Sequence, residues 1–86
     1  MPKKPVSISG HALFEMGRRG ISEAQVVRLV REPEQIVPSR KGRQIYQSKI
    51  AGGRLLLRVV VKEVAAAYHV VTAYKTSKVA KYWERT

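Results

Sequence analysis

The stretch RLLLRVVVKEVAAAYHVVTAY, residues 54–74, is where this chain keeps most of its apolar core. Branched and aromatic side chains dominate residues 54–61 and 64–74, and such side chains pack well on the pleated surface of a sheet. The polar pair Lys62-Glu63 separates the two runs. We therefore predict an antiparallel hairpin that turns at Lys62 and Glu63.

The predicted hairpin assigns its side chains to two faces. With a loop of even length, one face is apolar except for the hydroxyl of Tyr68, and we expect helices to cover it. Its members are Leu55, Leu57, Val59, Val61, Val64, Ala66, Tyr68 and Val70. The other face carries Arg54, Arg58 and His69 among small residues, with His69 opposite Leu56 or Arg58. A bulge or an odd loop would break this assignment.

Two helices are predicted before the hairpin. The first covers residues 10–19, with Ser7 or Ser9 as its cap and Gly20 at its end. The second begins at the capping box Ser22-Glu23-Ala24-Gln25 and stops before Pro33. The residues predicted to face inward are Ala12, Leu13, Met16, Phe14 as a further candidate, Val26, Val27, Leu29 and Val30.

Shorter strands are predicted between the helices and the hairpin. Residues 36–37 form a first strand that Pro38 stops, and a basic loop then leads to a strand over residues 43–50. Ala51-Gly52-Gly53 is a turn into the hairpin. We expect the strand over 43–50 or that over 36–37 to form the open edge of the sheet.

The two ends of the chain complete the predicted layout. Residues 1–5 are predicted to be a frayed tail, and Thr76 or Ser77 to cap a short last helix carrying Val79, Tyr82 and Trp83. The order of elements predicts a two-layer α+β domain over residues 1–86. Two N-terminal helices cover one face of an antiparallel sheet of three or four strands. The last helix half covers the other face, or leaves it open.

Composition limits the partners and the compartment. Lys and Arg number 17 against 6 acidic residues, which gives a net charge of +11. This balance favours nucleic acid or an acidic protein as partner, although a merely self-repelling surface is the alternative. The chain lacks the roughly 20 consecutive apolar residues that span a bilayer, and its N-terminus lacks the apolar stretch of a signal peptide. We expect a cytoplasmic protein without a membrane partner.

Two histidines are candidates for acid–base chemistry. His11 lies in the first turn of the first helix, where a surface or capping role is the alternative. His69 lies within a strand, where the alternative is a histidine half-buried under the C-terminal tail. Arg58 is predicted to supply charge to the reaction, and Tyr46 or Lys75 a second proton. Because the chain has no Cys and neither His has a ligand at a useful spacing, we expect no metal and no cofactor.

Basic residues supply candidates for binding a nucleic-acid backbone. Arg40, Lys41 and Arg43 form a basic loop beside a strand, and the loop is either simply solvated or in contact with phosphate. Arg54 and Arg58 are expected to be exposed on the sheet face, as a phosphate clamp requires. The predicted nucleic-acid-binding set is Arg40, Lys41, Arg43, Arg54, Lys75 and Lys78.

Three stretches carry a resemblance to known proteins. HALFEMGRRGIS (residues 11–22), RKGRQIY (40–46) and VVTAYKTSKVAKYW (70–83) resemble a family of small uncharacterised bacterial proteins. That family shows a His-Ala pair, an Arg-Gly-Ile-Ser helix junction and a closing Thr-x-Tyr motif. In layout it is similar to the RelE and BrnT ribonuclease toxins, with two helices followed by an antiparallel sheet. This chain departs from the family at Glu15, where the helix usually carries a basic residue.

The resemblance implies a RelE-like domain and a function. We expect an RNA-binding protein that acts as a metal-independent endoribonuclease toxin, with the ribosome helping to position its mRNA. An acidic, antitoxin-like protein is the expected partner, covering Arg43, Arg54 and His69. The alternative is a non-catalytic module that binds nucleic acid or an acidic protein.

Overall fold

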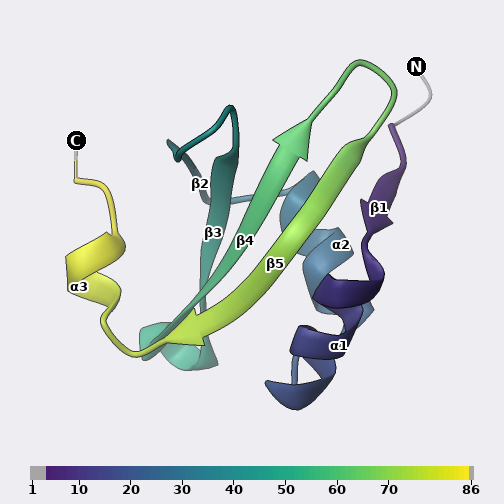
Figure 1. Ribbon diagram of the computed structural model, residues 1–86. Helices are drawn as coiled ribbons and strands as arrows, with labels where there is room; N and C mark the ends of the chain where they lie inside the picture. The colour runs from purple at the N-terminus through teal and green to yellow at the C-terminus, as the bar shows by residue number, and fades with distance from the viewer. Residues whose placement is uncertain (1–3, 86) are drawn as a thin grey trace.

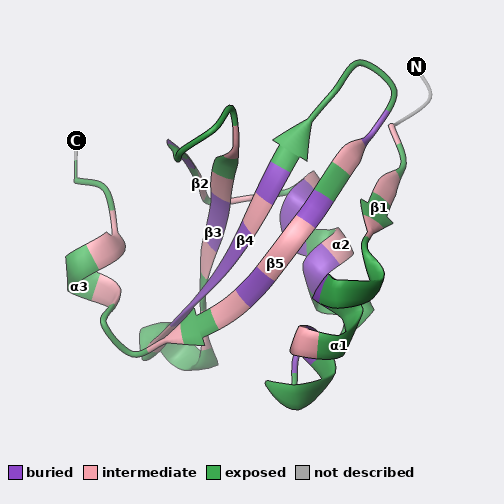
Figure 2. Ribbon diagram, viewed as in Figure 1, coloured by how far each residue is buried: buried purple, intermediate pink, exposed green. Residues whose placement is uncertain are grey.

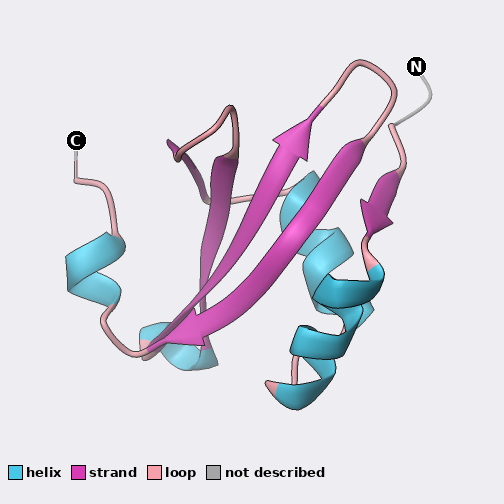
Figure 3. Cartoon of the chain, viewed as in Figure 1, coloured by secondary structure: helices cyan, strands magenta, loops and turns pink. Residues whose placement is uncertain are grey.

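The computed structural model describes residues 4–85, and in this range a sheet lies between helices (Figures 1 and 3). The α+β class predicted from the order of elements is confirmed, with a different arrangement of strands. The elements in chain order are β1 (Val6–Ile8), α1 (Gly10–Arg18), α2 (Glu23–Arg31), β2 (Gln35–Pro38), β3 (Gln44–Ile50), the 3₁₀ turn η1 (Ala51–Gly53), β4 (Leu55–Glu63), β5 (Tyr68–Thr76) and α3 (Val79–Tyr82).

The sheet has the strand order β1-β5-β4-β3-β2 in the described residues. The last four strands pair antiparallel, whereas β1 pairs with β5 in parallel. Helices α1 and α2 lie on one face of this sheet, here called the helix face, and α3 lies on the other, here called the tail face (Figure 1). The edges are therefore β1 and β2. Of the two strands predicted as the open edge, residues 36–37 in β2 form one, whereas β3 does not because β2 covers it.

Strand β1 was not predicted. Its three residues lie between Pro5 and the helix cap Ser9, and three residues are too few to show the alternation of a strand. The frayed tail predicted for residues 1–5 is also wrong in its described part. Lys4 Nζ lies 2.6 Å from the Glu63 carboxylate, and the Pro5 carbonyl accepts a hydrogen bond of 3.0 Å from Tyr68 N. Residues 1–3 of that predicted tail lie outside the described residues.

The helices begin where the sequence predicts. The hydroxyl of Ser9 accepts a hydrogen bond of 3.1 Å from Ala12 N, and Ser22 and Gln25 form a reciprocal capping box. On α1, only Ala12 and Met16 are buried, because residues four apart lie on one narrow stripe. Leu13 and Phe14 were predicted to face inward, but they are 38% and 64% exposed. On α2 the buried residues are Val26, Leu29 and Val30.

The core lies between the helix face and the two N-terminal helices. Leu57, Val59 and Val61 of β4 belong to it, as predicted from their alternation. They pack in one cluster with Met16 of α1 and Val26 of α2. Figure 2 shows buried residues concentrated along the middle of β4 and β5, with exposed residues at the turn between them.

The hairpin turn lies further along the chain than predicted. Strand β4 continues through Lys62 and Glu63, and the turn is made by residues 64–67, with Val64 and Ala67 exchanging backbone hydrogen bonds. Strand β5 also contains a bulge. Val61 pairs with Val70 but Val60 pairs with Thr72. The predicted assignment of β5 side chains to the two sheet faces therefore holds between the turn and the bulge, and it is inverted from Thr72 onward.

The C-terminal segment, residues 77–85, covers part of the tail face, as predicted. Gln47 Nε2 donates a hydrogen bond of 3.1 Å to the Tyr82 carbonyl, and Lys49 Nζ lies 4.2 Å from the centroid of the Trp83 ring. The predicted side-chain cap is absent from α3, although the Thr76 hydroxyl accepts a hydrogen bond from Lys78 N just before it. None of the helices formed by residues 4–85 is long and apolar enough to cross a membrane.

Candidate nucleic-acid interface

A row of basic side chains crosses the tail face near the β4–β5 turn. His69 of β5 pairs directly with Lys62 of β4. The pairing of β3 with β4 ends at Gln44 and Val61, and one further step in this register places Arg43 beside Lys62. Directly paired residues lie on the same face with their Cβ atoms about 5 Å apart. His69 on β5, Lys62 on β4 and Arg43, which directly precedes β3, therefore lie side by side.

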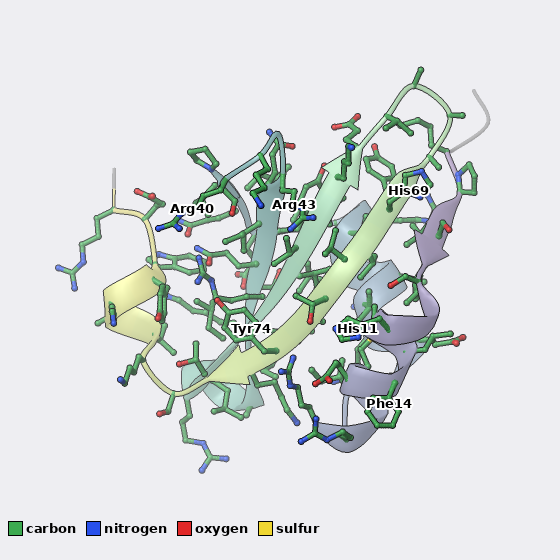
Figure 4. The ribbon with its side chains drawn as sticks, in the orientation of Figure 1. His11, Phe14, Arg40, Arg43, His69 and Tyr74 are labelled. Carbon is green, nitrogen blue, oxygen red and sulfur yellow. The ribbon has the colours of Figure 1, made fainter. Side chains whose placement is uncertain are left out.

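The loop between β2 and β3 adds two more cations at this end of the sheet. Ser39 N donates to the Arg43 carbonyl at 3.0 Å, and Arg43 N donates to the Arg40 carbonyl at 3.1 Å. Lys41 and Gly42 complete this tight loop with positive φ values of 57° and 72°. Figure 4 shows Arg40 and Arg43 extending from this part of the chain. We call Arg40, Lys41, Arg43, Lys62 and His69 the loop-end patch.

No member of the loop-end patch forms an ion pair within residues 4–85. The three ion pairs in this range involve Lys4, Arg18 and Arg19. Arg43 also borders an open groove, where Lys4 and Glu63 neutralise each other. The patch is therefore a concentrated positive surface that favours an anionic ligand.

The tail face holds a buried arginine on the side of the bulge away from the β4–β5 turn. Arg58 is only 6% exposed, whereas the sequence predicted an exposed clamp. Its Nε donates to Gln47 Oε1 at 2.9 Å and its Nη1 donates to the Tyr74 hydroxyl at 2.6 Å. The ring of Tyr82 from α3 covers it, with the guanidinium carbon 4.2 Å from the ring centroid. The bulge and the C-terminal segment together explain this burial.

The family model described as a domain of unknown function, DUF4258, matches residues 8–76. The chain belongs to this family. A comparison with the curated proteins finds no match. Among solved structures, the DUF4258 domain is similar to the ribonuclease toxin BrnT of Brucella abortus, solved at 1.1 Å resolution. The TM-score is 0.67 at 14% sequence identity, over 88% of this chain and 100% of that one, so the two share a fold.

The DUF4258 domain keeps its two histidines apart. His69 is exposed at the start of β5 on the tail face, whereas His11 is exposed on α1, which packs on the helix face (Figure 4). His69 does not lie opposite Leu56 or Arg58 either, because the turn at residues 64–67 pairs it with Lys62. The predicted site residues therefore fall into separate groups, of which the loop-end patch is the one that unites a histidine with several cations.

Tyr46 lies in the core of the DUF4258 domain and not on the basic face. It is 3% exposed, and its ring meets that of Tyr68 edge to face with centroids 6.1 Å apart. Burial, and then the neighbouring Glu63 and Tyr68, raise the pKa of the Tyr46 hydroxyl above its ordinary value. This side chain is thus placed to stabilise the core and cannot reach a ligand on the tail face.

Three predicted binding residues of the DUF4258 domain lie at the opposite end of the sheet from the loop-end patch. Arg54 precedes β4 and donates from Nε to the Ala51 carbonyl at 3.1 Å. Lys75 pairs with Leu57 and so lies on the helix face, and Lys78 precedes α3. The nine residues of β4 separate the two ends by about 27 Å.

Sequence reasoning missed Lys62 and Gln47. Lys62 was assigned to a turn because the pair Lys62-Glu63 was the polar break in an apolar stretch, yet both residues are paired in the sheet. Gln47 is fully buried, although amides are usually exposed, because Arg58 and the C-terminal segment satisfy it. Residues 4–85 contain no cluster of three or more His, Cys, Asp or Glu side chains able to hold a metal ion.

Proposed function

We propose that this chain binds single-stranded RNA on the tail face and cleaves it without a metal ion, as the toxin of a toxin–antitoxin pair. The observation that carries the proposal is the loop-end patch. Lys62, His69 and Arg43 share the tail face, Arg40 and Lys41 lie in the adjoining loop, and none of them forms an ion pair among residues 4–85. The fold shared with a ribonuclease toxin supports the same proposal. At 14% sequence identity, this similarity concerns the fold alone.

The patch supplies the groups that RNA cleavage requires. His69 removes the proton of the 2′-hydroxyl, and the freed 2′-oxygen forms a bond to the adjacent phosphorus. The bond from phosphorus to the 5′-oxygen breaks, and the Lys62 ammonium gives that oxygen its proton. Arg43 stabilises the negative charge that develops on the phosphoryl oxygens. The products are a 2′,3′-cyclic phosphate and a 5′-hydroxyl, after which His69 and Lys62 exchange protons with solvent.

These roles replace two sequence predictions. Tyr46 is enclosed in the core and Lys75 faces the helices, so neither reaches a phosphate beside His69. Lys62 pairs with His69 directly and takes the place of both as proton donor. His11 has no part in the proposed reaction because α1 lies on the opposite face.

One observation favours a second candidate, a binding module without catalysis. The His69 side chain has no hydrogen-bond partner among residues 4–85, whereas catalytic histidines are usually oriented by a neighbouring carboxylate or carbonyl. In this case the loop-end patch binds RNA and leaves it intact.

A cleavage assay separates the two candidates. Purified protein is incubated with a labelled single-stranded RNA and a chelator of divalent metals, beside the same RNA carrying 2′-deoxyribose throughout. The proposal predicts cleavage of the RNA alone, with products ending in a cyclic phosphate. It predicts that His69→Gln abolishes cleavage but still binds RNA, whereas His11→Gln cleaves normally. Binding without cleavage by the unmodified protein would favour the binding module.

The proposed antitoxin is a short acidic protein that covers the loop-end patch. Strand β2 offers it an edge next to the β2–β3 loop, with Ile36 49% exposed there and Pro38 discouraging pairing between identical edges. Such a partner neutralises Arg43 and covers His69, but it must be long to reach Arg54 at the other end. A 1:1 complex isolated from the native cell, unable to bind RNA, is the expected result. A protein that always purifies alone would count against this partner.

A further inference from the structure

We infer that Arg58 is a second anion site, for a phosphodiester group of RNA, and that the C-terminal segment covers it until RNA displaces that segment. This inference rests on the proposed function, since it names how the same RNA continues along the tail face. It adds a site and a moving part that the loop-end patch does not involve.

Arg58 is a buried cation without a buried anion. Its residue is 6% exposed, yet none of the ion pairs in residues 4–85 includes it. Neutral groups surround it instead, namely the Gln47 amide, the Tyr74 hydroxyl and the Tyr82 ring. Charged side chains are rarely buried unless they are paired, because burial removes their hydration. A site of this kind gains from an anion that enters it.

The guanidinium also keeps free donors. An arginine has five N–H groups, and Arg58 uses Nε and Nη1 for its two hydrogen bonds within the described residues. Nη2 donates to none of them. Since every fully buried side-chain nitrogen or oxygen in residues 4–85 has a partner, Nη2 must keep some contact with solvent. The free edge of the guanidinium suits the two oxygens of a phosphodiester.

The cover over Arg58 is held by few contacts. Helix α3 is a single turn of four residues, with no side-chain cap and no buried residue. A helix of this length has no stability of its own. The segment is attached by the Gln47 bond to the Tyr82 carbonyl and by two bonds of 2.7 and 3.0 Å between the Gln35 amide and the backbone of Glu84. Displacing it therefore removes no buried side chain of α3 from the core.

The position of Arg58 favours RNA over a small anion. Arg58 and Lys62 lie on the same face of β4, four residues apart, which is about 13 Å along a strand. An RNA strand that leaves the loop-end patch along β4 therefore reaches Arg58 within a few nucleotides. The rings of Tyr74 and Tyr82 lie beside Arg58, and exposed bases stack on such rings.

The one tryptophan of the chain reports on the cover. Trp83 lies in the C-terminal segment against Lys49, so lifting the segment exposes its indole. Quenching of its fluorescence by acrylamide is measured on the full chain, with and without saturating RNA that is 2′-O-methylated to prevent cleavage. Variant Gln35→Ala removes two of the attachments, and with them the hydrogen bond of 2.8 Å that Gln35 Oε1 accepts from Gln47 Nε2, while Arg58 itself is unchanged. Variant Gln44→Ala makes the same change at an exposed position of β3 where the side chain has no hydrogen bond within residues 4–85.

The inference predicts that RNA makes Trp83 several-fold more accessible to acrylamide. Gln35→Ala should be accessible without RNA and should bind RNA several-fold more tightly, because the bound conformation is already populated. Gln44→Ala should behave as the unmodified protein. Arg58→Lys, which keeps the charge but loses the planar fork, should bind RNA at the patch without exposing Trp83. The Gln35→Ala comparison decides the matter even where Arg58→Lys does not fold.

Two results would overturn the inference. They differ in whether they also reject the proposed function. RNA binding with unchanged Trp83 accessibility and equal affinities for Gln35→Ala and Gln44→Ala would reject the covered site and leave the proposed function standing. Absence of RNA binding by every form would reject the proposed function and, with it, the inference.

Discussion

Arg58 on β4 pairs with Tyr74 on β5, and its Nη1 donates a hydrogen bond of 2.6 Å to the Tyr74 hydroxyl. This pairing exists because the bulge in β5 shifts the register between Val60 and Val61. On the other side of the bulge, the turn at residues 64–67 sets the register and pairs His69 with Lys62. The tail face is thereby divided into an exposed loop-end patch and a covered arginine, and each region leads to separate predictions.

Replacing Tyr74 by Phe should destabilise the protein. Phe keeps the ring but removes the oxygen that accepts from Arg58, and hydrogen bonds to charged groups contribute about 1.5–3 kcal/mol. Urea unfolding measures the loss in the free energy of unfolding. Tyr82→Phe is the matched control, because the Tyr82 hydroxyl has no hydrogen-bond partner among residues 4–85. Equal losses for the two variants would show that the Arg58 bond contributes nothing specific.

Truncating Leu57 to Ala should cost about 2–5 kcal/mol of the free energy of unfolding, because the change leaves a cavity in the core. Leu57 is 2% exposed and belongs to the cluster between the helix face and the helices. Leu13→Ala is the same chemical change at a position that is 38% exposed, and it should cost much less. Denaturant midpoints of the two variants give the comparison. A cost for Leu13→Ala as large as that for Leu57→Ala would contradict the burial described for α1.

Stability should fall at high pH through Tyr46. Burial, Glu63 and Tyr68 raise the pKa of Tyr46 in the folded chain above 10.0, so the unfolded chain loses this proton first. The contribution is fully present below pH 10.0 and is lost as the pH rises through the folded pKa. Free energies of unfolding between about pH 9 and pH 11 should fall less steeply for Tyr46→Phe. Parallel curves for the two proteins would refute this coupling.

The caps of α1 and α2 and the core stripe of β4 followed from the sequence because they depend on local patterns. Ser22 and Gln25 lie at the spacing of a capping box. Leu57, Val59 and Val61 are two positions apart, so their side chains lie on the same face of a strand. Family membership and the shared toxin fold agree with the layout predicted from the same stretches.

The site was harder to predict because it depends on register. No residue in the run 70–73 marks the bulge, yet this one extra residue places Tyr74 opposite Arg58. The turn at residues 64–67, later than predicted, pairs His69 with Lys62 and not with Leu56 or Arg58. Burial of Arg58 depends further on Tyr82, which lies far along the chain in the C-terminal segment. Long-range packing of this kind leaves no local signal, so exposure was the natural expectation for a strand arginine.

The salt dependence of RNA binding tests the loop-end patch most directly. Affinity for single-stranded RNA is measured over a series of salt concentrations for the unmodified protein, Lys62→Ala and Arg28→Ala. Each variant loses one positive charge, but Lys62 lies in the patch whereas Arg28 is exposed on α2. The account predicts that Lys62→Ala lowers the magnitude of the log–log slope by about 0.7, the value for one phosphate contact, and that Arg28→Ala leaves it unchanged. The same change of slope in both variants would show that net charge alone attracts RNA, and would contradict a defined interface at the loop-end patch.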